Sequence, residues 1–372
     1  MPAQAMQPQK NESVLIVAGG GTGGHVLAGV AVAQEWQSRV PNAHVVFVGA
    51  RGGIEEKLVP RAGFTLEVLN LGTLNGVSLR RKIKTLFQIP FSIFRSALIL
   101  LRLRPQAVIG VGGYASGPLV LTAGILSFLR LLHCKTAILE QNSVPGMTNR
   151  VLGKIVGTAF CAFPGTEASF PSSRVFLTGN PTRSSIRELP PATRAPFTLF
   201  IFGGSQGALG INSLVLEALP HLANLNDRLR FIHQTGERDY DRTLAGYKAA
   251  GVDARVEKFI YEMPECYAAA SLLICRAGSS TLSEIAAVGR ASILVPFPHA
   301  SDDHQRKNAK VFVDRGAAIL LDQGTGKGEE LAALIRKLVT DSDSLGKMEQ
   351  AAKLFHRPNA ALDIVRELSQ TS

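Results

Sequence analysis

The chain has 372 residues, with 40 Lys and Arg against 29 Asp and Glu, which gives a formal net charge of +11. Hydrophobic residues make up 46% and charged residues 19%, enough apolar material for two domains of ~100–200 residues, which excludes a disordered chain. The four cysteines (Cys134, Cys161, Cys266, Cys275) share no C-x-x-C spacing, which excludes a zinc ribbon or disulfide scaffold and indicates a reduced, intracellular protein.

The first thirteen residues lack an apolar core, so we expect a disordered tail and not a secretory signal. Short apolar runs then alternate with stretches of helical spacing, a pattern typical of parallel sheets covered on both faces. The predicted strands are 14–18, 45–48, 108–111, 137–139, 159–162 and 175–177, then 198–202, 231–233, 272–275, 292–296 and 318–321. The sequence therefore predicts an α/β fold with two doubly wound, Rossmann-like parallel-sheet domains that face each other across a cleft.

The segment 180–196 is rich in Pro, Arg and Ser and poor in apolar residues, which indicates an inter-domain linker. We expect the first domain to span 14–182 and the second 183–355. The last helical stretch, 359–368, fits either domain by its pattern, and we assign residues 356–372 to the first.

The first glycine loop (residues 19–24, GGGTGG) follows a predicted strand and opens a helix, so it offers backbone N–H groups to a phosphate or another polar ligand. Gly19, Gly21 and Gly24 also satisfy G-x-G-x-x-G, but no carboxylate ends the second predicted strand to bind a ribose. This disfavours NAD, whereas Arg51 keeps an NADP-dependent oxidoreductase open as an alternative. The other alternative is a turn needed only for packing.

His25 lies in the first turn of the helix that follows this loop. The helix dipole there disfavours imidazolium, so a neutral ring that can accept a proton is expected. A histidine with a purely structural role is the alternative.

Two more glycine loops follow predicted strands, the second at 110–118 (GVGGYASGP) and the third at 203–207 (GGSQG). Ser205 in the third loop adds a hydroxyl donor suited to a phosphate oxygen. In doubly wound domains, ligands bind beyond the carboxyl ends of the strands, so these loops are candidate ligand-binding segments.

A fourth segment, CRAGSSTLSE at 275–284, ends a strand and begins a helix. We expect Ser279 or Ser280 to cap this helix and Gly289 to end it. Glu284 near the helix start has a carboxylate that could accept two sugar hydroxyls. A surface glutamate that only satisfies the helix dipole is the alternative.

Two D-x-D sequences, at 239–241 and 341–343, match a pattern found in metal-dependent sugar transferases. Neither follows an apolar strand, and both lie where helices are expected to begin, so we interpret them as helix caps. The eight histidines show no ligand spacing, and the sequence predicts no metal site.

No acidic residue occurs between Val68 and Leu139, a segment that carries nine of the positive charges. Apolar residues at helical spacing alternate there with basic ones, and Phe91, Phe94, Leu98 and Leu101 continue the pattern. The residues at its start are Leu79, Arg80, Arg81, Lys82, Ile83, Lys84 and Phe87.

Such a surface suits an anionic bilayer, because each basic residue near the membrane surface contributes about 1 kcal/mol to the free energy of binding. Nucleic acid also accepts this charge, but no recognition motif accompanies it, so a membrane is favoured. No run of ~20 uncharged apolar residues predicts a transmembrane helix. A non-catalytic basic scaffold at the membrane stays open as an alternative.

The motifs occur in the order found in the MurG family of bacterial N-acetylglucosaminyltransferases, which convert lipid I to lipid II. They are GGTGGH at 20–25, GGYASGP at 112–118, EQN at 140–142, GNPTR at 179–183, GGSQGA at 203–208, STLSEIAA at 280–287 and the later Gln305. The sequence resembles this family over nearly the whole chain after residue 13. The resemblance implies a GT-B fold and an inverting transfer of GlcNAc, without metal or cofactor, from UDP-GlcNAc to the MurNAc 4-hydroxyl of undecaprenyl-pyrophosphoryl-MurNAc-pentapeptide.

By position, the resemblance implies His25 as the catalytic base, with Glu140 next. It implies that Arg183 and Ser205 hold the diphosphate, that the backbone of Ile260 meets uracil and that Glu284 binds the ribose. The full donor set is Thr22, Gly23, Gly24, Asn142, Arg183, Ser205, Ile260, Ser279, Ser280, Thr281, Leu282, Ser283, Glu284 and Gln305. The implied acceptor loop contains Gly112, Gly113, Tyr114 and Ser116. Leu139 stands where the family often has His.

The resemblance also implies an acceptor- and membrane-binding first domain and a UDP-GlcNAc-binding second domain. The implied partners are UDP-GlcNAc, lipid I, anionic inner-leaflet phospholipid and other cell-wall or division proteins, with no nucleic acid. The implied location is peripheral, at the cytoplasmic face of the bacterial inner membrane, in peptidoglycan synthesis.

Overall fold

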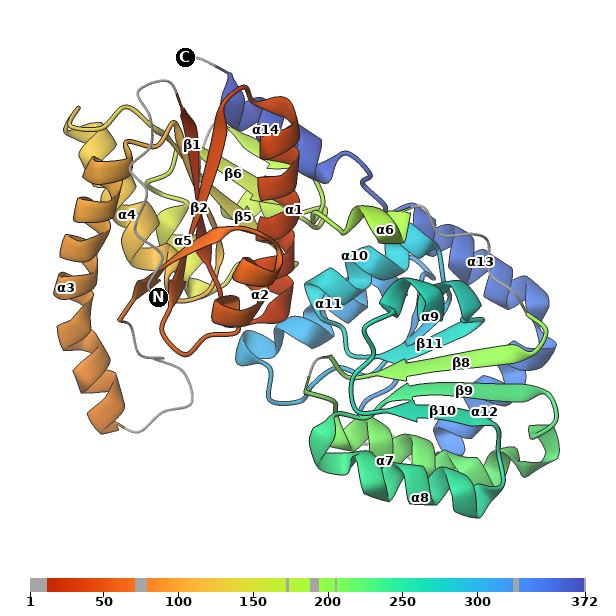
Figure 1. Ribbon diagram of the computed structural model, residues 1–372. Helices are drawn as coiled ribbons and strands as arrows, with labels where there is room; N and C mark the ends of the chain where they lie inside the picture. The colour runs from red at the N-terminus through yellow and green to blue at the C-terminus, as the bar shows by residue number, and fades with distance from the viewer. Residues whose placement is uncertain are drawn as a thin grey trace. The chain divides into compact units, whose positions relative to one another are not determined.

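The computed structural model describes residues 12–70, 79–171, 174–187, 194–204, 206–323 and 328–370, apart from the side chains of 79–87, Ser184 and Arg187. The chain divides into two compact units, Met1–Arg183 with Arg357–Ser372 and Ser184–His356 (Figure 1). The boundaries lie one residue later than those expected from the sequence. Arg183 is therefore the last residue of the first segment of unit 1, not the first residue of unit 2.

Unit 1 contains a sheet of seven parallel strands in the order β3-β2-β1-β4-β5-β6-β7. The strands are β1 (Ser13–Gly19), β2 (Ala43–Ala50), β3 (Thr65–Leu69), β4 (Ala107–Gly112), β5 (Lys135–Glu140), β6 (Thr158–Cys161) and β7 (Val175–Leu177). The order reverses between β1 and β4, and this switch point is where open parallel sheets form ligand crevices.

Helices cover both faces of this sheet because alternate residues of each strand point to opposite sides. Val14 and Ile16 of β1 join an apolar cluster with α3 to α5, whereas Leu15 and Val17 join a second cluster with α1 and the C-terminal α14. The helices are α1 (Gly23–Arg39), α2 (Glu55–Arg61), α3 (Leu79–Leu103), α4 (Ser116–Phe128), α5 (Met147–Leu152) and α14 (Ala360–Ser369), with a 3-10 turn at Thr166–Ser169.

Unit 2 contains six parallel strands in the order β10-β9-β8-β11-β12-β13, with the switch point between β8 and β11. The strands are β8 (Phe197–Phe202), β9 (Leu229–Gln234), β10 (Ala254–Glu257), β11 (Leu272–Cys275), β12 (Ser292–Leu294) and β13 (Ile319–Leu320). The α-helices are α6 (Ser184–Arg187), α7 (Leu209–Ala218), α8 (Tyr240–Ala250), α9 (Met263–Ala269), α10 (Ser279–Val288), α11 (His304–Val313), α12 (Gly328–Thr340) and α13 (Ser342–Lys353). Short 3-10 helices occupy Leu219–Leu225, Glu237–Asp239 and Ser301–Asp303.

The predicted fold class is confirmed, because both units are parallel sheets wound on both faces. Residues 1–11 of the predicted tail lie outside the described residues. The prediction is wrong at Ser13, which begins β1 and pairs with Ala43, because backbone pairing extends one residue past the apolar run. The predicted linker contains the short helix α6, in which Ile186 is fully buried.

Two of the predicted helix caps are wrong. Gly278, and neither Ser279 nor Ser280, is the N-cap of α10, because the backbone is extended at Gly278 and Ser279 is already helical. Asp239 makes no side-chain cap of α8, since its carboxylate is held by neighbouring side chains. Asp341 does cap α13 by accepting the N–H of Ser344 at 2.9 Å, and Gly289 ends α10 in the left-handed region.

Candidate functional site

The first two glycine loops of unit 1 pack against each other at the switch point of the sheet. The N–H of Gly20 donates to the carbonyl of Gly112 at 3.1 Å. A Cβ at Gly113 would lie 2.2 Å from the carbonyl oxygen of Gly20, and Gly113 also has a positive φ of 86°. Only glycine therefore allows this contact.

His25 lies in the first turn of α1, as predicted, and is half-buried. Thr22 is the N-cap, and its hydroxyl accepts the N–H of His25 at 3.4 Å. The ring Nδ1 lies 3.1 Å from the carbonyl oxygen of Gly20. Because a carbonyl can only accept, Nδ1 carries the proton, and in the neutral ring Nε2 is then the basic nitrogen.

The first glycine loop does not offer all of its N–H groups to a phosphate, and this part of the prediction is wrong. The N–H of Gly20 is used by Gly112, and the N–H of Gly21 donates to the carboxylate of Glu55 at 3.0 Å. Glu55 is buried and also accepts the N–H of Ala50 at 2.9 Å. A buried carboxylate at this position repels a phosphate, which argues against the dinucleotide interpretation of the loop.

Glu140 ends β5, and its side chain is almost fully buried. Its carboxylate accepts the N–H groups of Asn142 at 2.8 Å and Gly146 at 3.1 Å, and the side-chain amides of Asn142 at 3.2 Å and Asn149 at 2.9 Å. Burial raises the pKa of Glu140, and these hydrogen bonds oppose the rise. Glu140 therefore holds the turn that carries Asn142, because both of its carboxylate oxygens accept hydrogen bonds from residues 142–149.

The implied acceptor loop is only partly accessible. Gly112, Gly113 and Tyr114 are half-buried, whereas Ser116 is fully buried in the first turn of α4. The side chain of Ser116 therefore lies inside unit 1.

The third glycine loop (203–207), which lies in unit 2, packs closely against residues 234–236. A Cβ at Gly207 would lie 2.0 Å from the carbonyl oxygen of Thr235, and one at Gly236 would lie 2.3 Å from that of Gln206. Both glycines also have positive φ angles. Ser205 lies outside the described residues.

Gln234 connects two of the predicted donor segments. Its Nε2 donates to the carbonyl of Gly204 at 2.8 Å, and its Oε1 accepts the N–H of Ile260 at 2.8 Å. The N–H of Ile260 is therefore engaged within the protein, so a backbone contact from Ile260 to a base would have to use its carbonyl. Sequence reasoning missed Gln234, because residue type does not mark its contacts with backbone groups 30 and 26 residues away.

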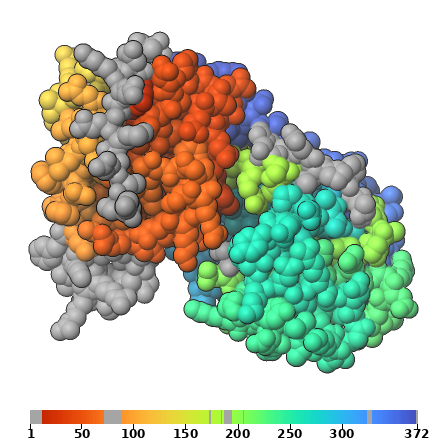
Figure 2. Space-filling model, in the orientation of Figure 1, coloured from red at the N-terminus to blue at the C-terminus, as the bar shows by residue number. Residues whose placement is uncertain are grey.

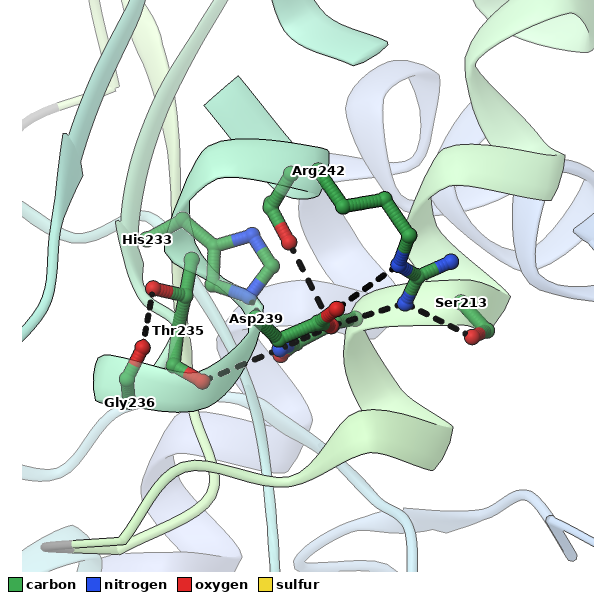
Figure 3. A network of polar contacts seen from close by, with 8 residues as sticks. Ser213, His233, Thr235, Gly236, Asp239 and Arg242 are labelled. Atoms are coloured by element: carbon green, nitrogen blue, oxygen red, sulfur yellow. Dashed lines mark hydrogen bonds and ion pairs between the residues drawn. The ribbon is translucent and has the colours of Figure 1, made fainter. Parts of the chain in front are cut away.

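A buried polar network lies behind the third loop (Figure 3). The ring of His233 lies with Nδ1 3.0 Å from the Tyr247 hydroxyl and Nε2 3.0 Å from Oδ1 of Asn212. Burial lowers the pKa of His233 to about 3, so the ring is neutral at physiological pH. Asn212 belongs to α7, the helix that the third loop opens, and its Nδ2 donates to the carbonyl of Thr235 at 3.0 Å.

Asp239 completes this network and explains why it does not cap α8. Its carboxylate accepts from Asn212 at 2.8 Å and from two nitrogens of Arg242 at 2.7 Å. The hydrogen bond from Arg242 holds the pKa of Asp239 below its ordinary value. The network connects α7 to the turn after β9. Because the third glycine loop precedes α7, these hydrogen bonds also hold that loop in place.

Helix α10 carries the fourth predicted segment. Glu284 is 9% exposed and accepts the Tyr267 hydroxyl at 2.8 Å, so the alternative of a surface glutamate is wrong. Leu282 is fully buried, and the hydroxyl of Ser283 donates to the carbonyl of Ser279 at 3.0 Å. Ser280 and Thr281 are half-buried in the first turn of the helix.

Gln305 lies in the first turn of α11, where its Oε1 accepts the N–H of Phe297 at 3.0 Å. Gln305 thus ties α11 to the segment that leaves β12. Within the part of the chain that the structure describes, no three His, Cys, Asp or Glu side chains are grouped as metal ligands would be.

The two parallel-sheet units, each with a glycine-rich loop at its switch point, match two family models of glycosyltransferases. The Glycosyltransferase family 28 N-terminal domain matches residues 15–161, and the Glycosyltransferase family 28 C-terminal domain matches residues 198–364. The chain belongs to glycosyltransferase family 28.

Individual relatives are more specific. The chain is 43% identical, over 94% of its length and 91% of the relative's, to the UDP-N-acetylglucosamine--N-acetylmuramyl-(pentapeptide) pyrophosphoryl-undecaprenol N-acetylglucosamine transferase of Myxococcus xanthus. The enzyme of the same name from Syntrophus aciditrophicus is 44% identical over 94% of this chain and 96% of its own. The crystal structure of Acinetobacter baumannii MurG matches with a TM-score of 0.77 and 32% identity, covering 96% of this chain and 100% of that chain.

These similarities confirm the resemblance to the MurG family. A UDP-GlcNAc 2-epimerase from Neisseria meningitidis has a TM-score of 0.67 at 14% identity, covering 96% of this chain and 99% of that one, and so shares only the fold. None of these relatives is an oxidoreductase, and the NADP alternative has no support among them.

Proposed function

We propose that this protein is an inverting hexosyltransferase that moves GlcNAc from UDP-GlcNAc to the MurNAc 4-hydroxyl of lipid I and so forms lipid II. The observation that carries the proposal is the 43% identity over 94% of the chain to a relative named for this transfer. The loop geometry of both units supports it, because unit 1 presents an oriented histidine and unit 2 presents buried polar groups at its switch point.

In this proposal, Nε2 of His25 accepts the proton of the acceptor hydroxyl, because Nδ1 already donates to Gly20. The hydroxyl oxygen attacks the anomeric carbon on the face opposite UDP. The bond from that carbon to the diphosphate oxygen breaks with its electron pair on UDP, which inverts the configuration and leaves the proton on His25. Arg183 and Ser205 are proposed to stabilise the charge on the leaving diphosphate.

The uracil and ribose of the donor are proposed to bind unit 2. The carboxylate of Glu284, oriented by Tyr267, is an acceptor for two ribose hydroxyls. Gln234 holds the Gly204 and Ile260 segments at a fixed separation, which pre-organises the diphosphate and uracil contacts. Ser279 to Ser283 and Gln305 complete the proposed donor site, and Thr22, Gly23, Gly24 and Asn142 are proposed to approach the sugar from unit 1.

We also propose that unit 1 docks on the anionic cytoplasmic face of the inner membrane. Helix α3 lies at the surface of unit 1, where Figure 2 shows it in orange, and its Phe91, Phe94, Leu98 and Leu101 are 45–60% exposed. Helix α3 packs against α4, and α4 packs against α5. Helices α4 and α5 and the residues that follow each of them also expose large apolar side chains, namely Ile125, Phe128, Leu129, Leu131, Met147, Val151 and Ile155.

Membrane docking of this kind is peripheral. Among the described helices, none has the length and apolar character needed to cross a bilayer. The side chains of 79–87, which include four of the nine basic residues of the acid-free segment, lie outside the described set. Arg102 is paired with Glu67 at 2.6 Å. Binding to other cell-wall or division proteins stays a prediction.

The test is transfer of labelled GlcNAc from UDP-GlcNAc to a lipid I analogue with EDTA present. We expect transfer with inversion, and we expect His25→Gln to lower kcat by about 10²-fold or more. His221→Gln, which changes an exposed histidine of unit 2, is the matched control and should match the unaltered protein. Absence of transfer, or its loss on adding EDTA, would contradict the proposal.

A further inference from the structure

Glu55 is a buried glutamate whose side chain is surrounded by glycines. It does not belong to any of the motifs found in the sequence. Its side chain is 1% exposed at the start of α2. A Cβ at Gly20, Gly49 or Gly53 would lie 2.0, 2.5 or 2.3 Å from atoms of this side chain. Three backbone segments therefore close on the carboxylate, and each is a glycine where it does so.

Within the described residues, the hydrogen bonds to Glu55 come from two backbone N–H groups, those of Gly21 and Ala50, and not from a cation. Burying a carboxylate without a cation is unfavourable unless its oxygens are well satisfied. An apolar side chain could fill this space with a smaller desolvation penalty than a carboxylate. The role of Glu55 is therefore to accept hydrogen bonds through its oxygens.

The peptide group between Gly20 and Gly21 links Glu55 to His25. Its N–H donates to Oε2 of Glu55 at 3.0 Å, and its C=O accepts from Nδ1 of His25 at 3.1 Å. The N–H and C=O of a trans peptide point in opposite directions, so a hydrogen bond at one end fixes the direction of the other. Because both residues are glycine, this peptide plane has little steric resistance to rotation without Glu55.

We propose that Glu55 is a positioning residue that sets the tautomer and orientation of His25. By holding the Gly20–Gly21 peptide plane, it keeps an acceptor in front of Nδ1 and so keeps Nε2 as the basic nitrogen. The inference rests on the proposed function in that His25 receives the proton of the acceptor hydroxyl.

The test is Glu55→Gln, which keeps the shape of the side chain. An amide has one acceptor oxygen, so its NH₂ would face an N–H donor and one of the two hydrogen bonds would be lost. In ¹⁵N spectra, His25 should be the Nδ1–H tautomer in the unaltered protein and a mixture in the variant. The kcat should fall about tenfold or more, while the KM for UDP-GlcNAc, whose proposed uracil and ribose contacts lie in unit 2, should change less than about twofold.

Two further variants separate positioning from stability. Glu56→Gln is the matched control, because Glu56 is exposed and accepts one backbone N–H, that of Gly52 at 3.0 Å. Its spectrum and kcat should match those of the unaltered protein. Gly53→Ala places a methyl group 2.3 Å from Cδ of Glu55, so it displaces the carboxylate but keeps its charge, and it should reproduce the mixed tautomer. It makes the same test if Glu55→Gln does not fold.

An unchanged His25 tautomer in these variants, even with a lowered thermal midpoint, would overturn the inference and leave Glu55 as scaffold only. An unaltered protein that transfers no GlcNAc would overturn the proposed function instead, and the spectra would still decide the role of Glu55.

Discussion

At the residue scale, Glu55, Glu140 and His233 share one property: each is a buried polar side chain that holds a loop beside the proposed site. Glu55 accepts from the first glycine loop, Glu140 from the turn at 142–149, and His233 bonds the helix that follows the third loop. Hydrogen bonds of this kind are strong where water is excluded, and a missing partner is costly. Mobile glycine loops thereby acquire a fixed shape.

The buried His233 should make the protein less stable as the pH falls. Burial lowers its pKa from 6.5 to about 3, so between these values the unfolded chain binds a proton that the folded protein does not. Each pH unit below 6.5 therefore removes about 1.4 kcal/mol of stability. His233→Gln should be less stable than the unaltered protein at pH 7, and the difference should narrow by about 2 kcal/mol at pH 5.

Urea unfolding at pH 7, 6 and 5 measures this difference. The exposed His221→Gln variant is the control, and its free energy of unfolding should run parallel to that of the unaltered protein. If the difference in free energy of unfolding between His233→Gln and the unaltered protein stays constant across these pH values, the lowered pKa of His233 is contradicted.

Motif residues such as His25, Glu140 and Glu284 could be found from the sequence because glycines, strand ends and helix starts mark their positions. Glu55 and Gln234 could not be found in the same way. Both act on a backbone group of a loop distant in the chain, and Glu55 lies 34 residues from its partner Gly21. The direction of a peptide N–H in a glycine loop leaves no trace in residue type.

At the scale of elements, the helix at 79–103 is the one whose exposed face matters most. Its inner face, with Ser92, Ser96, Ile99 and Leu100, is buried, while Phe94 and Leu98 point outward at 60% and 47% exposure. An apolar outer face on a helix that begins with a basic cluster is typical of interfacial binding.

For the double variant Phe94→Glu and Leu98→Glu, the affinity for vesicles that contain phosphatidylglycerol should fall by about tenfold or more, because the variant removes apolar contact and adds negative charge. Vesicle co-sedimentation measures the change. Leu354→Glu is the matched control, since Leu354 is 74% exposed in unit 2, and it should bind like the unaltered protein. Equal loss in both variants would argue against docking through α3.

The interior strands were predictable and two edge strands were not. β3 and β10, each at the edge of its sheet, were missed. β3 carries Glu67 and β10 carries Arg255 and Glu257, so neither shows the continuous apolar run of a strand buried on both faces. The predicted strand 292–296 was too long, because β12 ends at Leu294 while the apolar residues continue beyond it.

At the scale of the whole molecule, ligand binding should distinguish the proposed transferase from the oxidoreductase alternative. A ligand that binds only the folded protein at 100 times its Kd adds about 2.7 kcal/mol to the free energy of unfolding. UDP-GlcNAc should therefore raise the thermal midpoint, and NADPH should leave it unchanged.

Glu284→Ala should lose most of the UDP-GlcNAc-dependent shift, because it removes the proposed ribose acceptor. The exposed Glu265→Ala variant on α9 is the control and should keep the shift. Equal shifts with UDP-GlcNAc and NADPH would count against the transferase assignment.

The return of the chain to unit 1 has a consequence for its biosynthesis. Ile364, Val365 and Leu368 of α14 belong to the same apolar cluster as Leu15 and Val17 of β1. Unit 1 is translated first, yet this cluster is incomplete until the last helix has left the ribosome. Unit 2 is continuous in sequence, from Ser184 to His356. Because domains fold as units during synthesis, we expect unit 1, which is translated first, to complete its core last.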